Sequence, residues 1–180
     1  ELKRLAARLK LASVFKWVDD FLQETDEKIV LFGIHKAILK PLYERYERQA
    51  VLIDGSVSML NRQRAVKKFQ TDAQTRILVG NLTAAGTVFT MTAAAYAAMV
   101  ESDFVPGVMI QAEDRICRIS QTRAVIIYYL LAKGTIESYI YQKVVKKAHV
   151  VTETLDGRVN RQTESIMNEL MSYLVNSKKG

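Results

Sequence analysis

Five short apolar runs punctuate the first 132 residues, and more polar segments separate them. Most of the runs are continuous rather than alternating, which is typical of strands that are buried on both faces. We therefore predict five strands, at KIVLF (28–32), AVLID (50–54), RILVG (76–80), YAAMVES (96–102) and AVIIYYLLA (124–132).

Helix-like segments lie between these runs, for example at 35–48 and 58–69. In the second segment, Met59, Val66 and Phe69 are spaced to line one helical face. That spacing leaves its cations for solvent or ligand: Arg62, Arg64, Lys67 and Lys68. Strands that alternate with helices predict a three-layer α/β domain with a mostly parallel sheet and right-handed crossovers.

Both ends of the chain have helical patterns. At the start, apolar residues at helical spacing predict an amphipathic helix that ends near Thr25: Leu11, Val14, Phe15, Val18 and Leu22. At the other end, Thr135 can cap a long helix, and a final helix covers 161–175. We expect an N-terminal helix at 1–26, the α/β domain at 27–134 and a C-terminal helical extension at 135–180. Because the helical pattern begins at Glu1 without a methionine, we expect a fragment of a longer protein.

The composition of the chain gives it a net positive charge. Lys and Arg number 26 against 19 Asp and Glu, giving a net charge of +7. Such an excess favours polyanion partners, above all nucleic acid, although a generically basic protein explains it equally well. The single cysteine, Cys117, excludes an intrachain disulfide, and no apolar run approaches the length of a membrane span. We expect no membrane partner and an intracellular location, which is the nucleus in a eukaryote and the cytoplasm or nucleoid otherwise.

Several kinds of catalytic site are missing from the sequence. A phosphate loop (a glycine, four residues, then Gly-Lys-Ser or Thr) is absent, and only Gly33 follows the first apolar run. The lack of a glycine-rich first loop also argues against a cofactor enzyme such as a methyltransferase. The acidic pairs at 19–20 and 26–27 do not follow a strand, and His35 and His149 are far apart in the sequence. We expect no metal site and no hydrolysis by this chain alone.

Polar residues follow several predicted strands. The segment DGSVS (54–58) offers Ser56 for a turn and Ser58 as a helix N-cap, and a helix N-terminus offers free amides to a phosphate. The segment starting at Asn81 contains Thr83 and Gly86, whose small or hydroxyl side chains allow a sugar-phosphate chain to approach. Taken singly, each segment is explained equally well or better by an ordinary turn or by packing.

The segment QAEDRICRISQ (111–121) sets Arg115 and Arg118 three residues apart. In a helix these guanidiniums share a face and repel each other unless an anion lies between them. A pair of this kind on its own is more often structural, with Glu101, Glu113 or Asp114 as the partner.

In their order and spacing, these segments resemble the second RecA-like lobe of superfamily 2 helicases, and more narrowly the SWI/SNF-type DNA translocases. The last motif of that family reads Gln-Ala-x-x-Arg-x-x-Arg-x-Gly-Gln. Five residues match it: Gln111, Ala112, Arg115, Arg118 and Gln121. The segments QAEDR (111–115) and KGTIES (133–138) look most like the annealing-helicase, fork-remodelling branch. The resemblance covers roughly residues 10 to 150.

The resemblance implies that ATP lies between two RecA-like lobes. The other lobe, N-terminal in the parent protein, would hold ATP and Mg²⁺ through its phosphate loop and acid pair. Arg115 and Arg118 would be arginine fingers, which stabilise charge on the γ-phosphate in the transition state. Gln111 and Gly86 would contact or sense the nucleotide. The missing phosphate loop is then expected, and the isolated chain should be inactive.

The resemblance also implies contacts with double-stranded or branched DNA. Four residues match positions that lie along the duplex backbone in the family: Ser56, Arg62, Asn81 and Thr83. Contacts with phosphates bind DNA largely without regard to its sequence and are sensitive to salt.

The sequence departs from the family pattern at several positions. Val88 and Ser120 stand where glycine is usual, Phe104 where tryptophan is usual, and Cys117 where histidine is common. Valine seldom adopts the positive φ that glycine allows, so the backbone near ATP or DNA is altered if Val88 lies at such a position. The alternative to a motor lobe is a non-catalytic DNA-binding or interaction module derived from the same fold.

Overall fold

The computed structural model describes residues 2–82, 91–101, 124–132, 135, 139 and 141, all within the compact unit Glu1–Val145. Its centre is a sheet of five parallel strands in the order β2-β3-β1-β4-β5. The strands are β1 (Ile29–Gly33), β2 (Ala50–Ile53), β3 (Ile77–Asn81), β4 (Tyr96–Met99) and β5 (Ile126–Tyr129). All the predicted strands and their parallel arrangement are confirmed.

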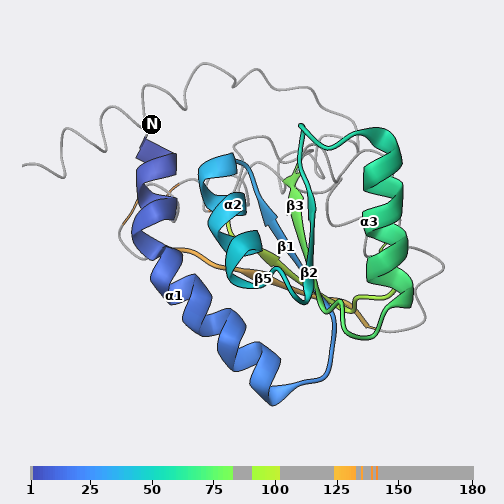
Figure 1. Cartoon of the computed structure of the whole chain (residues 1–180). Helices are drawn as coiled ribbons and strands as arrows, with labels where there is room; N and C mark the ends of the chain where they lie inside the picture. Colours follow the sequence, from blue (N-terminus) through green and yellow to red (C-terminus); the bar gives the residue numbers. More distant parts are fainter. Residues whose placement is uncertain are drawn as a thin grey trace, which may run out of the picture. The chain divides into compact units, whose positions relative to one another are not determined.

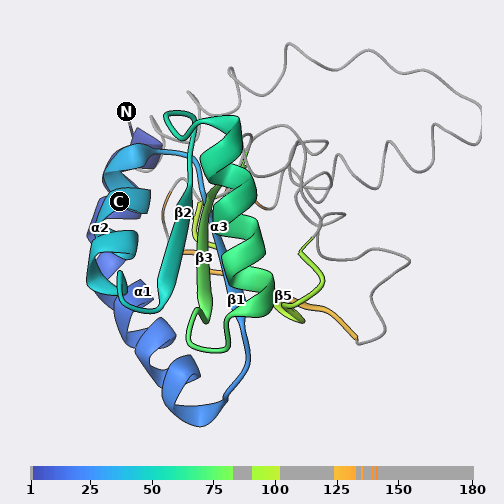
Figure 2. The same cartoon turned by 45° about the vertical axis from the view of Figure 1, so that its right-hand side comes forward.

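Helices cover both faces of this sheet. They are α1 (Leu2–Glu24), α2 (Lys36–Arg45) and α3 (Met59–Thr71). Helices α1 and α2 lie on one face, and α3 lies on the other (Figures 1 and 2). This arrangement confirms the predicted three-layer α/β architecture. Apart from residues 139 and 141, the predicted helices after Thr135 lie outside the described residues, and the predicted domain boundaries remain predictions.

An apolar cluster fills the space on each side of the sheet. Ile29 and Leu31 point toward α1 and α2, whereas Val30 and Phe32 belong to the cluster on the α3 side, together with Phe69. Successive side chains of a strand face opposite sides of the sheet, so both sets must be apolar when both faces are covered. This explains why the central strands read as continuous apolar runs.

Two predicted apolar positions are more exposed than their neighbours. Ile126 is 44% exposed because β5 is an edge strand, whose residues are only partly covered. Met59 is 47% exposed because α3 packs on the sheet through its later turns, where Phe69 is fully buried. The side chain of Met59 therefore does not extend the inner face of α3.

A polar network joins α1 to α2 on the outer side of the first cluster. The Asp19 carboxylate accepts hydrogen bonds from Arg45 Nη2 at 2.6 Å and from the Tyr46 hydroxyl at 2.7 Å. Burial opposes ionisation of Asp19, but these two hydrogen bonds and the charge of Arg45 outweigh it and hold the pKa of the carboxyl below its ordinary value. Asp19 is therefore a structural residue that fixes the two helices together.

Candidate functional site

The carboxyl ends of four neighbouring strands lie at one edge of the sheet, which we call the carboxyl edge. Gly33, at the end of β1, pairs with Asn81, at the end of β3. On the other side of β3, Ile53 pairs with Gly80, while the amide of Val100 after β4 donates to Phe32 O at 2.8 Å. Ligands of parallel α/β sheets bind outside this edge, so the loops that follow these strands form the candidate site.

The segment after β2 forms the turn and helix start that the sequence predicts. Asp54 Oδ1 accepts hydrogen bonds from Ser56 N at 2.8 Å and from Ser56 Oγ at 2.6 Å. Ser58 then caps α3, because its Oγ accepts from Asn61 N. Asp54 thus holds the exposed Ser56 side chain in place at the carboxyl edge.

The Asp54 side chain is only 8% exposed, yet its carboxyl favours the ionised form. Burial by itself raises its pKa, but the hydrogen bonds from Ser56 and the charge of Lys36, whose Nζ lies 3.7 Å from Asp54 Oδ2, lower the pKa below its ordinary value. The negative charge of Asp54 is therefore compensated by the ammonium group of the exposed Lys36, which forms an ion pair with it.

Arg62 lies in the first turns of α3, next to the same turn. Its Nε donates a hydrogen bond to Val57 O at 2.8 Å, which orients the guanidinium at the start of the helix. The side chain is partly exposed. An arginine held through Nε can still present its terminal nitrogens in a planar fork, the geometry suited to a phosphate.

The loop between β1 and α2 shows a feature that the sequence did not predict. Glu101, which follows β4 and is 3% exposed, accepts hydrogen bonds from Ile34 N, His35 N and His35 Nδ1. From the opposite side, Asn81 Nδ2 donates to Ile34 O at 2.7 Å. The signal available in the sequence was one acid at the end of an otherwise apolar run, YAAMVES (96–102).

The structure thus places three of the predicted site residues at the carboxyl edge: Ser56, Arg62 and Asn81. Asn81 also supports a neighbouring loop, a role that sequence reasoning missed. The other predicted residues lie outside the described part of the chain: Thr83, Gly86, Gln111, Arg115 and Arg118. Their roles remain predictions.

Two cations at the opposite, amino edge of the sheet have structural partners. Lys28 Nζ donates to the carbonyl oxygens of Phe69, Asp72 and Thr75, at and beyond the end of α3. Burial lowers the pKa of the Lys28 ammonium, although the charge of Asp72 opposes this effect. Arg76 donates in the same way to carbonyls at the end of α1 and in the segment that follows it. These two charges compensate the carbonyl oxygens at helix ends.

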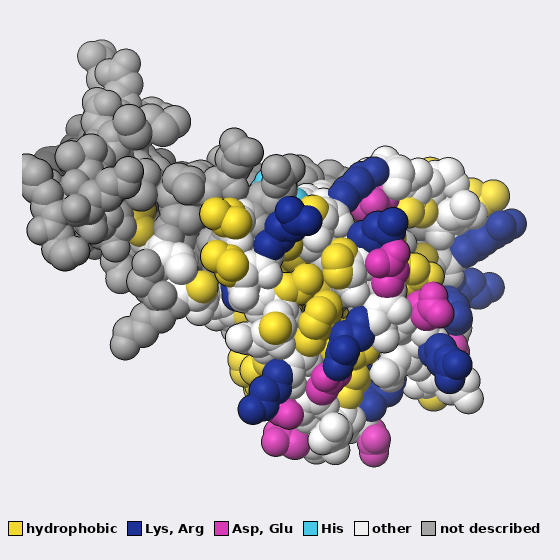
Figure 3. All heavy atoms as spheres, turned by 60° about the vertical axis from the view of Figure 1, so that its left-hand side comes forward, with side chains coloured by type: hydrophobic (Ala, Val, Ile, Leu, Met, Phe, Trp, Pro, Cys, Tyr) yellow, Lys and Arg dark blue, Asp and Glu magenta, His cyan; other side chains and the backbone are white. Residues whose placement is uncertain are grey.

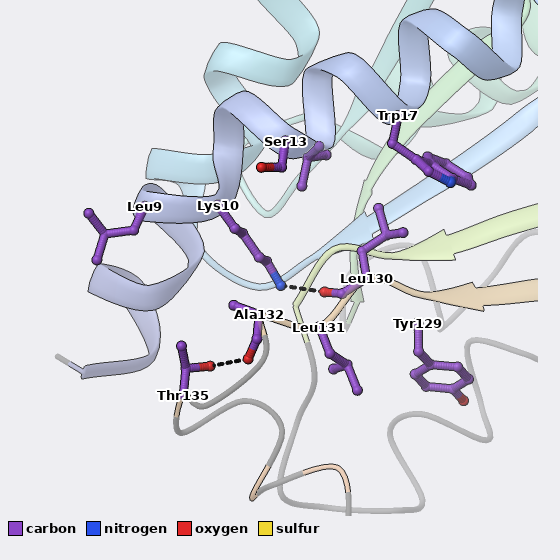
Figure 4. Close-up of a pocket in the computed structure, with 10 residues that line it drawn as sticks. Leu9, Lys10, Ser13, Trp17, Tyr129, Leu130, Leu131, Ala132 and Thr135 are labelled. Atoms are coloured by element: carbon purple, nitrogen blue, oxygen red, sulfur yellow. Dashed lines mark hydrogen bonds between the residues drawn. The ribbon is translucent and has the colours of Figure 1, made fainter.

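A groove of about 540 Å³ lies between the first half of α1 and the segment after β5 (Figure 4). Lys10 spans it and donates from Nζ to Leu130 O at 2.6 Å, while Leu9 and Trp17 lie on the α1 side. Figure 3 shows hydrophobic side chains gathered on the exposed surface of the molecule among charged ones, and Leu9 is 77% exposed. Among the described lining residues, Lys10 and Tyr129 are the only ionisable groups.

The described residues contain no group of three or more His, Cys, Asp or Glu side chains arranged to hold a metal ion. None of their helices is both long enough and apolar enough to cross a bilayer.

Comparison with known proteins shows the family to which this chain belongs. Residues 13–120 match the family described as the helicase conserved C-terminal domain. The chain is 36% identical over 164 residues to a SWI/SNF-related matrix-associated actin-dependent regulator of chromatin subfamily A-like protein 1 from Xenopus tropicalis, covering 88% of this chain and 17% of the relative. It is also 36% identical over 169 residues to the human DNA annealing helicase and endonuclease ZRANB3, covering 92% of this chain and 16% of the relative.

A solved structure agrees with these relatives. The C-terminal part of the Fun30 ATPase domain is 26% identical, with a TM-score of 0.67, over 74% of this chain and 44% of that chain. The chain therefore spans only a sixth or so of the curated relatives named above and under half of this structure. The shared fold and the family match together identify the domain: the chain belongs to the helicase conserved C-terminal domain family, as a RecA-like lobe of the SWI/SNF type.

Proposed function

We propose that this chain is the second motor lobe of an ATP-dependent DNA translocase or helicase. An N-terminal RecA-like lobe of the parent protein would hold ATP and Mg²⁺ in the cleft between the lobes. This chain would supply arginine fingers and contacts to the DNA backbone. The observation that carries the proposal is the carboxyl edge of a domain of this family, where Ser56 and Arg62 follow β2 and Asn81 ends the neighbouring β3.

The ligand proposed for this edge is the sugar-phosphate backbone of double-stranded or branched DNA. The hydroxyl of Ser56 and the guanidinium of Arg62 are donors suited to phosphate oxygens, and Asp54 and Val57 hold them at one loop. Thr83, two residues beyond Asn81, would extend the same path. Contacts of this kind position a motor on DNA without reading its sequence.

The nucleotide side of the proposal rests on residues outside the described part of the chain. Arg115 and Arg118 would reach across the cleft to the γ-phosphate, where a permanently charged guanidinium stabilises the transition state. Gln111 and Gly86 would contact the nucleotide. ATP binding would close the two lobes, and hydrolysis would reopen them, so that one lobe moves along the DNA relative to the other.

Arg62→Ala in the full parent protein tests the DNA side. We expect weaker binding to a duplex of arbitrary sequence, and a logarithmic salt dependence that is shallower by about 0.9, the value for one phosphate contact. Fluorescence anisotropy of a labelled duplex over a series of salt concentrations measures both quantities. Arg48→Ala is the matched control, because Arg48 is exposed and lies just before the amino end of β2. An unchanged salt slope for Arg62→Ala would remove this residue from the interface.

The purified 180-residue chain should hydrolyse no ATP, with or without DNA. The reason is that the proposed catalytic site is shared between two lobes and this chain lacks the phosphate loop. A coupled ATPase assay measures the turnover, with the full parent protein as the positive control. Robust turnover by the chain alone would overturn the two-lobe arrangement.

A second candidate function is a non-catalytic DNA-binding or interaction module. The departures from the family pattern favour it: Val88, Phe104 and Ser120 replace residues usual in working motors. The sequence upstream of Glu1 separates the two candidates, because a phosphate loop and an acid pair there would indicate a working motor.

The relatives suggest where the protein acts. One is named as a regulator of chromatin and another as a DNA annealing helicase. We infer a nuclear location and a DNA substrate, which is double-stranded or branched.

A further inference from the structure

Glu101 is a buried acid that accepts its hydrogen bonds from one loop, the segment between β1 and α2. Its side chain is 3% exposed, and Oε2 accepts from Ile34 N at 2.7 Å and from His35 N at 2.8 Å. The other oxygen, Oε1, lies 2.7 Å from His35 Nδ1. Burying a carboxylate costs free energy unless hydrogen-bond donors surround it. The loop therefore stabilises the charge of Glu101, and the charge in turn holds the loop in this conformation.

The same loop is fixed by β1 and by the strand on its other side. Asn81, at the end of β3, donates from Nδ2 to Ile34 O at 2.7 Å. At Gly33 a Cβ atom would lie 2.9 Å from Leu39 Cδ2 and 3.2 Å from Glu101 Oε2, so glycine permits the close approach of the carboxylate. In the sheet β1 lies between β3 and β4, and the loop after β1 is therefore held from both neighbours.

The result is a histidine with a fixed orientation at the carboxyl edge. Nδ1–H of His35 donates to the carboxylate, which leaves Nε2 as the ring nitrogen directed elsewhere. The His35 side chain is 34% exposed, so the ring reaches the surface. The next residue, Lys36, is 63% exposed and lies beside Asp54 in the turn that carries Ser56. A phosphate at Nε2 would require a ring protonated on both nitrogens, because a neutral ring that donates from Nδ1 presents Nε2 as an acceptor.

We propose that Glu101 is a positioning residue for DNA binding: it holds the loop between β1 and α2 and directs the His35 ring at a phosphate of the bound duplex. The inference rests on the proposed function, because the duplex is the ligand proposed for the carboxyl edge. It adds His35 as a contact residue and gives Glu101 a role through His35 rather than through its own charge.

Whether Glu101→Gln strengthens or weakens duplex binding distinguishes a positioning role of Glu101 from an effect of its charge alone. This substitution keeps the size of the side chain and removes a negative charge. If Glu101 affected DNA only through its charge, its removal would strengthen the binding of a polyanion. If Glu101 positions the loop and His35, binding should weaken, because the amide of glutamine offers a donor where the loop also presents donors.

The experiment uses the full parent protein with four variants: Glu101→Gln, His35→Ala, the double variant and Glu47→Gln. Duplex affinity is measured by fluorescence anisotropy with a labelled duplex of arbitrary sequence, and thermal unfolding is followed for each variant. Glu47 is the matched control, because it is an exposed acid near the amino edge, so its change of charge is the same.

We expect each single variant, Glu101→Gln and His35→Ala, to bind the duplex about tenfold more weakly, the loss typical of one charge-assisted hydrogen bond. The double variant should also lose about tenfold rather than about a hundredfold, because both changes remove one coupled interaction. Glu47→Gln should bind like the wild type.

Three outcomes overturn the inference while the wild type still binds DNA: Glu101→Gln binds as tightly as the wild type or more tightly, His35→Ala binds like the wild type, or the losses in the double variant multiply. If Glu101→Gln does not fold, His35→Ala decides alone, since it removes only a partly exposed ring. Failure of the proposed function looks different, because the wild type itself would then not bind the duplex.

Discussion

Replacing Arg118 with alanine in the full parent protein should lower DNA-stimulated ATP turnover by about a thousandfold or more, the usual cost of losing an arginine finger. The physical reason is that the transferred phosphoryl group spreads negative charge over its oxygens, and a guanidinium placed there stabilises that charge. Duplex binding should persist, because the proposed DNA contacts lie on other loops, at Ser56 and Arg62. Steady-state ATP hydrolysis at saturating DNA, beside an anisotropy assay for binding, measures both quantities.

Arg48→Ala controls for the loss of a positive charge, since Arg48 is exposed and far along the chain from the proposed nucleotide contacts. Its turnover should equal that of the wild type. Should wild type and Arg118→Ala hydrolyse ATP equally, or should neither do so, the motor proposal fails. The non-catalytic DNA-binding module would then take its place.

Replacing Arg76 with alanine should lower the free energy of unfolding by about 3 kcal/mol, the order expected when hydrogen bonds to a charged, partly buried group are lost. Its guanidinium donates to the carbonyl oxygens of Leu22, Thr25 and Glu27, which end α1 and lead into β1. Alanine leaves these acceptors without their partner and removes the positive charge that compensates the end of the helix. Urea unfolding of the chain, followed by the fluorescence of its single tryptophan, Trp17, measures the loss.

Two further variants show whether the shape or only the charge of Arg76 matters. Arg76→Lys keeps the charge but cannot reach several carbonyls with a planar fork, so it should recover only part of the lost stability. Arg48→Ala should leave the unfolding curve unchanged. A stability of Arg76→Ala equal to that of the wild type would contradict the structural role and would return Arg76 to the pool of cations available for DNA.

The contrast between Arg76 and Arg62 shows what a net charge of +7 does not reveal. By sequence, both are arginines near predicted strands and helices, and both are plausible ligands of a polyanion. Both side chains are partly exposed, but their surroundings differ. Arg76 lies before β3 at the amino edge and donates to three carbonyl oxygens, whereas Arg62 lies after β2 at the carboxyl edge and donates through Nε to one, that of Val57. The two arginines lie at opposite edges of the sheet, and only the folded chain shows which edge each occupies. This position distinguishes the structural cation, Arg76, from the candidate DNA contact, Arg62.

Much of the fold could be predicted from the sequence because its signals are local. Continuous apolar runs indicate strands that are covered on both faces, and the spacing of Val14, Val18 and Leu22 indicates a helix with one buried face. Ser58 as a helix cap followed from residue type and position, and the cap is present. The order of the motifs along the chain was enough to indicate the family that residues 13–120 match.

The sequence by itself therefore determined the strands, the helices α1, α2 and α3, the layered architecture and the family of this protein, since each depends on hydrophobic periodicity or on motif order along the chain. Only the tertiary structure decided which polar side chains meet. Glu101 and His35 are 66 residues apart in the sequence, yet their atoms lie 2.7 Å apart because β1 and β4 are neighbours in the sheet. Such contacts depend on strand order, and strand order is set by how the helices pack on both faces rather than by any local pattern of residues.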